Sequence, residues 1–421
     1  MIPSYAEPVM NDTGYVIQNY VTGICCSPTT MAFEGNDILV LSKVSGQVHL
    51  FRDGVLQDKP VLQENVTSVG EQGMLGITTV GTKVYLYFTE SAKMGGHPLG
   101  KRVYSYDWNG QQLVNKTLVK DLPQTQTYHN GGAMTTAKNG SVYLVVGDAG
   151  RFGKLQNHPT GEPDDTSVIF RLVPPGPYYA MGIRNSFGLT TDPITGTLWD
   201  TENGPDFGDE VNMVPPGFNS GWDVIQGPAN KTTLSKPNIA GDFTGWSINT
   251  GPTNKTTLVQ LPRYPGYTYH DPQFTWIKTV APTGIAFTAP QGFGKYKDSV
   301  FVGDCNNGNL YRFQLNQNRD GFVFNSPQLQ DNVVNVGDSM KEIIFATNFG
   351  CISDVVIGPD GLLYVTSLTD GTIYRIVPQS DIVDIENISP QILYVLFVAI
   401  PIAIIIIYTR YRKKSRKKIN A

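Results

Sequence analysis

Residues 354–366 read DVVIGPDGLLYVT, and residues 371–376 read GTIYRI. This stretch predicts a short apolar strand, a glycine-rich turn, a second apolar strand and, after a polar loop, a third. Similar units begin near Met31, Met74, Gly131, Gly188 and Gly284. A short β-unit that recurs at wide spacing is typical of a β-propeller. The sequence therefore predicts an all-β, six-bladed propeller, with blades at about 30–56, 74–108, 131–173, 185–215, 284–315 and 353–377.

The repeats favour one large β domain in a chain of 421 residues. An ordinary β-sandwich with unrelated turns is the alternative. The 44 Gly and 28 Pro fit a fold with many tight turns. The long stretch 216–283 is expected to hold an elaborated loop or extra hairpins at the mouth. The expected organisation is an N-terminal extension over 1–25, the propeller over 26–380, a linker over 381–391, a transmembrane helix over 392–409 and a basic tail over 410–421.

The C-terminal segment predicts a membrane anchor. Residues 392–408 are 17 uncharged residues, at the short end for a helix that spans a bilayer. A buried core strand or helix is the alternative, but the terminal position and the basic flank argue against it. The positive-inside rule puts the tail in the cytoplasm, so we expect a single-pass cell-membrane protein with a large extracellular domain. The basic residues of the tail are Arg410, Arg412, Lys413, Lys414, Arg416, Lys417 and Lys418.

Charge and sequons agree with an exterior domain. The chain carries −4 overall, and without the seven tail residues it has 25 Lys and Arg against 36 Asp and Glu, or −11. That balance argues against a nucleic-acid partner. No secretory signal is visible in residues 1–18, and we expect that one was removed rather than that the C-terminal span directs insertion. Seven sequons are compatible with a glycoprotein: Asn11, Asn65, Asn115, Asn139, Asn230, Asn254 and Asn387.

Propeller topology predicts where the polar loops meet. The loop that enters each innermost strand and the loop after the second strand open on the same face. His129 and Asp148 lie in two such loops of one blade, so the carboxylate can fix the imidazole tautomer and leave the other nitrogen as a base. Arg184 is a candidate to stabilise an oxyanion or bind a carboxylate. The alternatives are an exposed histidine beside a turn aspartate, and a structural salt bridge.

An acidic loop follows in the next blade. Residues 202–210 read ENGPDFGDE, and backbone carbonyls with carboxylates suit a hard cation such as Ca²⁺. The spacing is not that of an EF-hand, and a turn with capping aspartates is the alternative. The chain shows no phosphate-binding glycine loop, zinc-spaced motif or G-x-S-x-G elbow.

Several phrases together resemble the glucose/sorbosone dehydrogenase family, whose six-bladed propellers include aldose dehydrogenases dependent on pyrroloquinoline quinone. The resemblance covers about 26–378, in order. The phrases are GEQGMLGI at 70–77, HNGG at 129–132, GIRNSFGL at 182–189, ENGP at 202–205, GDEVN at 208–212, NSGW at 219–222 and APTGIAF at 281–287.

The resemblance implies a role for each matching residue. His129 would take the proton of the sugar's anomeric hydroxyl as hydride passes to the quinone, with Asp148 orienting it and Arg184 against the quinone oxygens. Carbonyls of Gly204 and Pro205 would hold Ca²⁺. The other cofactor-side positions are Glu71, Asn185 and, as an aromatic on the substrate side, Trp276.

The chain also departs from the family's pattern. Residues 351–353 contain no arginine, Asn306 stands where a lysine can occur, and Asn203 and Ala133 replace a histidine and an arginine. Pyrroloquinoline quinone has three carboxylates, and each lost charge-assisted hydrogen bond weakens binding by about 1.5–3 kcal/mol. Lys278 and Arg151 are candidates to compensate. The resemblance thus implies the catalytic side of the site more strongly than the cofactor's anchors.

All four cysteines map to mouth-side loops of the first, fifth and sixth blades. An exterior domain favours disulfides, and a soft-metal site is the alternative. Because the first and sixth blades meet when the ring closes, we predict a bond from Cys351 to Cys25 or Cys26. Cys305 would then bond the remaining cysteine, or Cys351 instead.

The expected function is a membrane-anchored extracellular dehydrogenase of aldoses or alcohols, with pyrroloquinoline quinone and Ca²⁺ as cofactors. The electron acceptor is not specified by any motif. Two alternatives stay open: a non-catalytic cell-surface propeller that binds a glycan or protein, and a propeller hydrolase such as a lactonase with Ca²⁺ at its mouth.

Overall fold

The computed structural model describes residues 7–25, 27–122, 126–150, 153–229, 233–234, 248–249, 261 and 264–381. The chain divides into two units, Met1–Val377 and Pro378–Ala421. The described part of the first unit is built almost wholly of strands, with one 3-10 turn, η1 (Lys154–Gln156). Of the second unit, the structure describes the end of β32 and the 3-10 turn η3 (Gln379–Asp381). The described fold is an all-β propeller.

Six sheets have four or more strands, and each is named here by its innermost strand. The β3 sheet holds β3 (Pro28–Glu34), β4 (Asp37–Ser42), β5 (Gln47–Arg52) and β6 (Val55–Leu56), with β7 (Leu62–Gln63) on β5. The β8 sheet holds β8 (Met74–Val80), β9 (Lys83–Ser91), β10 (Pro98–Trp108) and β11 (Leu113–Leu122). The β12 sheet holds β12 (Met134–Thr136), β13 (Val142–Val146), β14 (Val168–Val173), β15 (Tyr178–Met181), β19 (Phe218–Asn219) and β22 (Thr268–Tyr269).

The other three sheets complete the ring. The β16 sheet holds β16 (Ser186–Thr191), β17 (Leu198–Glu202), β18 (Phe207–Val214), β23 (Phe274–Lys278) and β28 (Val333–Val334). The β24 sheet holds β24 (Pro282–Phe287), β25 (Ser299–Asp304), β26 (Leu310–Leu315), β29 (Ile344–Thr347) and β1 (Val9–Met10), with β27 (Phe322–Val323) on β26. The β30 sheet holds β30 (Ile352–Ile357), β31 (Leu363–Ser367), β32 (Thr372–Pro378) and β2 (Tyr15–Val21).

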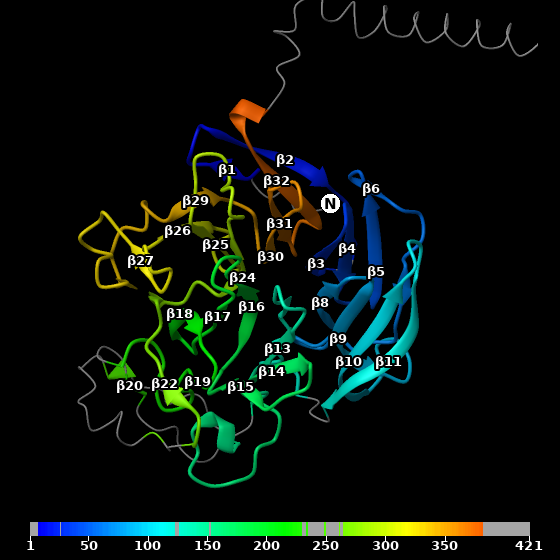
Figure 1. The fold of residues 1–421 in the computed structure, drawn as a ribbon, viewed down its shortest axis with the longest axis horizontal. Helices are drawn as coiled ribbons and strands as arrows, with labels where there is room; N and C mark the ends of the chain where they lie inside the picture. Colours follow the sequence, from blue (N-terminus) through cyan, green and yellow to red (C-terminus); the bar gives the residue numbers. More distant parts are fainter. Residues whose placement is uncertain are drawn as a thin grey trace, which may run out of the picture. The chain divides into compact units, whose positions relative to one another are not determined.

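The innermost strands contact one another in a closed cycle, β3 to β8, β12, β16, β24, β30 and back to β3. Figure 1 shows these strands around the centre of the first unit. The second strand of the β3 sheet is apolar at its centre: Ile38, Leu39, Val40 and Leu41 of β4 are all buried. Such strands lie between neighbouring sheets, so both of their faces are covered.

Glycine in the innermost strands permits this packing. A Cβ on Gly188 would lie 2.1 Å from the carbonyl oxygen of Thr283, and one on Gly284 would lie 2.3 Å from the nitrogen of Val355. Any side chain would therefore force adjacent strands apart. This explains why the sequence repeats begin at glycine in these two blades.

The structure corrects the expected N-terminal boundary. Residues 1–25 were expected to form an extension, but β2 is the outer strand of the β30 sheet and β1 is the outer strand of the β24 sheet. Arg375 of β32 donates to Oε1 of Gln18 in β2 at 2.8 Å. The physical reason is that β32 would otherwise be an unpaired edge. The N-terminal strand closes the ring.

Extra elements occur in 216–283, as expected. They include β19, β22 and a two-stranded sheet of β20 (Thr233–Leu234) and β21 (Ile248–Asn249). The prediction of a transmembrane helix at 392–409 falls outside the described residues and stays a prediction. Among the residues that are described, the protein has no helix long and apolar enough to cross a membrane.

Candidate functional site

His129 and Asp148 form the centre of the candidate site. His129 precedes β12 and Asp148 follows β13, so adjacent strands bring them together. Nδ1 of His129 lies 2.6 Å from Oδ1 of Asp148, whose side chain is only 4% exposed. His129 has φ of 54°, which is uncommon for a residue with a side chain. Its carbonyl accepts from the N–H of Ala149 at 3.2 Å. The hydrogen bond expected from the sequence is present, and it leaves Nε2 as the ring nitrogen that can take a proton.

Trp222 is a member of the site that sequence reasoning did not assign. Its indole Nε1 donates to Oδ2 of Asp148 at 2.7 Å, while the N–H of Gly150 donates to Oδ1 at 2.8 Å. Both carboxylate oxygens are thus held, and the imidazole partner cannot rotate freely. The phrase NSGW at 219–222 was the available signal, but nothing in it pairs the indole with a residue 74 positions away.

Arg184 joins the same cluster. Its backbone carbonyl accepts from the N–H of Asp148 at 2.8 Å. The guanidinium donates from Nη1 to the carbonyl of Asn203 at 2.8 Å and lies 5.2 Å from the centre of the Trp222 ring. Burial lowers the pKa of Arg184, and Asp148 and Glu202 oppose that shift. Its Nε is buried and has no hydrogen-bond partner among the described residues.

Glu71 and Asn185 lock the loop that carries His129. Oε2 of Glu71 accepts from the N–H of Asn130 at 3.0 Å, and the side-chain nitrogen of Asn185 lies 3.3 Å from both Glu71 oxygens. Oδ1 of Asn185 accepts from the N–H of Gly131 at 3.1 Å. The structure therefore brings both predicted cofactor-side residues to the site, and their contacts hold the loop.

Lys101 is a second residue near the site that sequence reasoning did not assign. It is fully buried in β10, and its ammonium has no hydrogen-bond partner among the described residues. Burial lowers the pKa of Lys101 to about 8, although Glu71 and Asp148 favour its charged form. A lysine on a strand gives no sequence signal for such a position, because the strand pattern does not reveal which face is sealed.

The turn at Gly204 and Pro205 is fixed by Asp209. This carboxylate accepts from the N–H groups of Gly204 at 2.8 Å, Val280 at 2.6 Å and Ala281 at 2.8 Å. Burial raises the pKa of Asp209 to about 6. In the described part of the chain, no group of three His, Cys, Asp or Glu side chains could hold a metal ion. The Ca²⁺ expectation therefore depends on the two carbonyls of this turn and stays a prediction.

Three further acids lie under the site on β17 and β18. Asp200, Glu202 and Glu210 are fully buried. The hydroxyl of Ser220 donates to Glu202 at 2.6 Å and lies 3.3 Å from Glu210, and Glu202 also accepts from the N–H of Arg184 at 2.6 Å. Burial raises the pKa of Asp200 and of Glu202 to about 8 each. Burial therefore favours the protonated forms of these acids, and Glu202 helps to fix the Arg184 backbone.

Trp276 lies elsewhere. It is fully buried in a core cluster, with ring centres 4.9 Å from Phe274 and 5.1 Å from Tyr311. It does not line the cavity of the site. The physical reason is that β23 packs its aromatic residues between two sheets. Of the candidates to compensate for missing anchors, Lys278 is exposed at the end of β23, and Arg151 lies outside the described residues.

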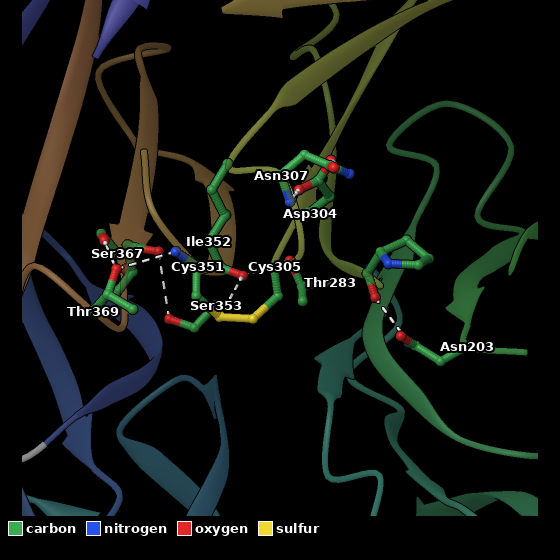
Figure 2. The surroundings of a disulfide bond; sticks show 12 residues. Asn203, Thr283, Asp304, Cys305, Asn307, Cys351, Ile352, Ser353, Ser367 and Thr369 are labelled. Carbon is green, nitrogen blue, oxygen red and sulfur yellow. Dashed lines mark hydrogen bonds between the residues drawn. A yellow bond between two sulfur atoms is a disulfide. The ribbon is translucent and has the colours of Figure 1, made fainter. Parts of the chain in front are cut away.

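The disulfide joins Cys305 to Cys351 (Figure 2). The predicted bond from Cys351 to Cys25 or Cys26 is wrong, and the other pairing considered for Cys305 is correct. Cys305 follows β25 and Cys351 precedes β30, and these two strands contact one another. The bond therefore links the β24 and β30 sheets. The predicted bond would have linked the β3 and β30 sheets, which correspond to the first and last predicted blades.

A cavity of about 350 Å³ opens beside the Cys305–Cys351 disulfide, and it is called the mouth-side cavity below. Loops and inner strands of all six sheets line it. Its charged lining residues are Lys43 and Glu71. The others are Ser27, Thr29, Thr30, Gly70, Leu75, Gly131, Ala133, Phe187, Asn203, Ala281, Thr283, Cys305, Cys351, Ile352, Ser353 and Leu368.

Comparisons with known proteins agree with this architecture. The family model described as "Glucose / Sorbosone dehydrogenase" matches residues 26–375. Aldose sugar dehydrogenase YliI of Escherichia coli is 24% identical over 281 residues, which is 63% of this chain and 64% of that relative, so less than two thirds of its length is spanned. Quinoprotein glucose dehydrogenase B of Acinetobacter calcoaceticus is 27% identical over 30% of this chain and 32% of its own.

Solved structures show the same fold. The PQQ-bound aldose sugar dehydrogenase of Streptomyces coelicolor has a TM-score of 0.60 at 22% identity, over 86% of this chain and 98% of its own. The apo-form of the soluble aldose sugar dehydrogenase of Escherichia coli has a TM-score of 0.64 at 19% identity, over 87% and 100%.

Proposed function

Because this chain belongs to the glucose/sorbosone dehydrogenase family, we propose that it is a dehydrogenase that oxidises a hydroxyl group of an aldose or alcohol, with a quinone as hydride acceptor. We count each of the six sheets with at least four strands as one blade of a six-bladed propeller. The observation that carries the proposal is the chain of contacts from His129 through Asp148 to Trp222.

Each residue of the site has a separate role in the proposed reaction. Nε2 of His129 takes the hydroxyl proton, since Asp148 holds Nδ1 and stabilises the imidazolium that forms. Arg184, desolvated beside Trp222, supplies positive charge that stabilises the negative charge developing in the reaction. Glu71 and Asn185 keep the His129 loop in its left-handed conformation. A bound quinone would supply the acceptor for the hydride that leaves the carbon bearing this hydroxyl, so that a carbonyl product would form.

The described residues do not fit pyrroloquinoline quinone in full. Arg184 and Asn185 could face the quinone edge, but the lining of the mouth-side cavity has Lys43 as its one cation, opposed by Glu71. Three carboxylates would enter a cavity whose lining supplies one cation. Ca²⁺ on the carbonyls of Gly204 and Pro205 belongs to the proposal, since hard cations take backbone oxygens.

We also propose that the enzyme is a single-pass cell-membrane protein with its propeller outside. The uncharged segment 392–408 and the basic tail support this arrangement. Four sequon asparagines, Asn11, Asn65, Asn115 and Asn139, are exposed. Carbonate extraction of membranes and glycosidase treatment of intact cells test the two parts separately.

The test of activity uses the purified full chain in detergent. It is incubated with Ca²⁺ and, in parallel, with pyrroloquinoline quinone or an uncharged naphthoquinone, and reduction of a dye is followed on a panel of aldoses and alcohols. We expect turnover that falls about 10²–10⁴-fold in His129→Ala, as for a lost general base. If no quinone supports turnover of any substrate, the proposal is wrong, and binding of a glycan or protein becomes the better reading.

A further inference from the structure

The walls of the mouth-side cavity offer few free hydrogen-bond donors. Three hydroxyls that line it already donate to backbone carbonyls: Thr29 to Met74 at 2.9 Å, Thr283 to Ile352 at 2.8 Å and Ser353 to Pro28 at 2.9 Å. These donors serve the inner strands, which they tie together across adjacent sheets. The surfaces that they turn to the cavity are therefore mainly carbon.

The amide and the cation of the cavity are engaged in the same way. Nδ2 of Asn203 donates to the carbonyl of Pro282 at 2.9 Å, and Nζ of Lys43 donates to the carbonyl of Gly70 at 2.7 Å. Glu71 is the one acid in the lining, so the two charged residues balance one another. A ligand with several carboxylates would leave most of its charge without a cationic partner in the lining, which is unfavourable for the part of the ligand that is buried.

The remaining lining is apolar and polarisable. Leu75, Phe187, Ile352 and Leu368 line the cavity together with the Cys305–Cys351 disulfide. Figure 2 shows the two sulfur atoms beside Ser353 and Thr283. Sulfur makes favourable contacts with aromatic rings. A cavity of about 350 Å³ is at the lower end of the range for small-molecule sites, roughly 300–1,000 Å³.

We propose that the mouth-side cavity binds an uncharged one- or two-ring quinone, not a tricarboxylate quinone. This inference rests on the proposed dehydrogenase function, which needs a hydride acceptor, and it names the class of that acceptor. The tether expected from residues 392–408 agrees with it, because uncharged quinones dissolve in a lipid bilayer.

The cavity lies next to the catalytic pair. Glu71 lines it and accepts from the N–H of Asn130, the residue after His129. Asn203 lines it and accepts from Arg184 through its carbonyl. In the reaction, the substrate C–H bond breaks and its electron pair moves with hydrogen to the quinone. The hydroxyl proton goes to Nε2 of His129 and then to the reduced quinone, so that a carbonyl compound and a hydroquinone form.

Binding can be measured without turnover. The full chain in detergent is titrated with 2-methyl-1,4-naphthoquinone and, separately, with pyrroloquinoline quinone plus Ca²⁺, by tryptophan fluorescence and by isothermal calorimetry. We expect the naphthoquinone to bind at least tenfold more tightly than the tricarboxylate. Equal or tighter binding of pyrroloquinoline quinone would overturn the inference, as would a failure of the naphthoquinone to bind.

Two substitutions at one position localise the site. Leu368→Trp fills the cavity and should weaken naphthoquinone binding at least tenfold. Leu368→Arg adds a cation at the same point and should shift the preference toward pyrroloquinoline quinone. Both variants are first checked for an unchanged melting temperature. If both bind the two quinones as the unaltered protein does, the ligand lies outside the mouth-side cavity and the inference is wrong.

The experiments distinguish a failure of the proposed dehydrogenase function from a failure of the proposed quinone class. Turnover with pyrroloquinoline quinone and none with the naphthoquinone would overturn the inference while the dehydrogenase function stands. Tight naphthoquinone binding that depends on Leu368, without oxidation of any aldose or alcohol, would support the cavity assignment and overturn the function.

Discussion

The indole nitrogen of Trp222 lies 2.7 Å from Oδ2 of Asp148, the carboxylate whose other oxygen holds His129. The indole also lies beneath the guanidinium of Arg184. One side chain from the segment after β19, in the sheet that also carries His129 and Asp148, thus positions the proposed base, its partner and the cation. The site depends on a contact between segments 74 positions apart in the sequence rather than on any single loop.

Trp222→Phe should lower the turnover number about 10- to 100-fold. The ring is kept, but a hydrogen bond to a charged group is lost, and such bonds contribute about 1.5–3 kcal/mol. Dye-linked kinetics and their pH profile measure the effect. The matched control is Trp199→Phe, because Trp199 is equally buried but belongs to the core cluster that contains Trp276. Equal rates in the two variants would show that the indole does not position Asp148.

Lys101→Met should stabilise the protein at pH 7. The pKa of Lys101 falls from 10.5 to about 8 on folding, so the buried charge destabilises the fold by roughly 3 kcal/mol below pH 8. That penalty shrinks as pH rises from 8 through 10.5, and the advantage of the variant shrinks with it. Urea unfolding at pH 7 and pH 10 checks this. Lys83→Met, at an exposed lysine, is the control. Destabilisation at pH 7 would mean that Lys101 has an essential partner.

Asp200→Asn should flatten the fall of stability with rising pH. Burial raises the pKa of Asp200 from 3.8 to about 8, so the folded state keeps a proton that the unfolded state loses between these values. The free energy of unfolding therefore falls as pH rises from about 4 to about 8. Denaturant unfolding at pH 5 and pH 8 compares the variant with Asp206→Asn, at an exposed position. A steeper slope in Asp200→Asn contradicts the prediction.

Deletion of residues 1–21 should lower the melting temperature markedly and expose the edge of β32. This removes β1 and β2, which complete the β24 and β30 sheets. Deletion of residues 1–6 leaves both strands in place and serves as the control. Differential scanning calorimetry measures the two truncations. If the long deletion melts like the short one, the N-terminal strand does not close the ring.

Cys305→Ser should destabilise the protein by at most about 4 kcal/mol, because the bond closes a loop of 46 residues. Reduction with dithiothreitol should have the same effect on the unaltered protein and none on the variant. Non-reduced peptide mass spectrometry should recover the 305–351 pair, and it should still do so in Cys25→Ser. Recovery of a 25–351 peptide instead would refute the pairing seen here.

The sequence predicted which loops meet at the site, but it did not predict which side chains contact one another there. The blade repeats place His129, Asp148 and Arg184 in loops of one face, because strand alternation and turn chemistry are local. The pairing of Trp222 with Asp148 joins segments 74 positions apart in the sequence, and the sealing of Lys101 depends on how adjacent sheets face one another. Trp276 shows the opposite case. Its place in the sequence matches the family's aromatic residue on the substrate side, but its side chain packs in the core.

The sequence by itself determined the repeated β-unit, the histidine–carboxylate pair and the uncharged C-terminal segment, since each depends on residues near one another or on a fixed repeat. Only the tertiary structure decided that β2 closes the ring, that Cys351 bonds Cys305, and that the cavity walls carry almost no free charge. These depend on long-range packing, in which strand edges, sulfur atoms and hydrogen-bond donors select partners far away in the chain.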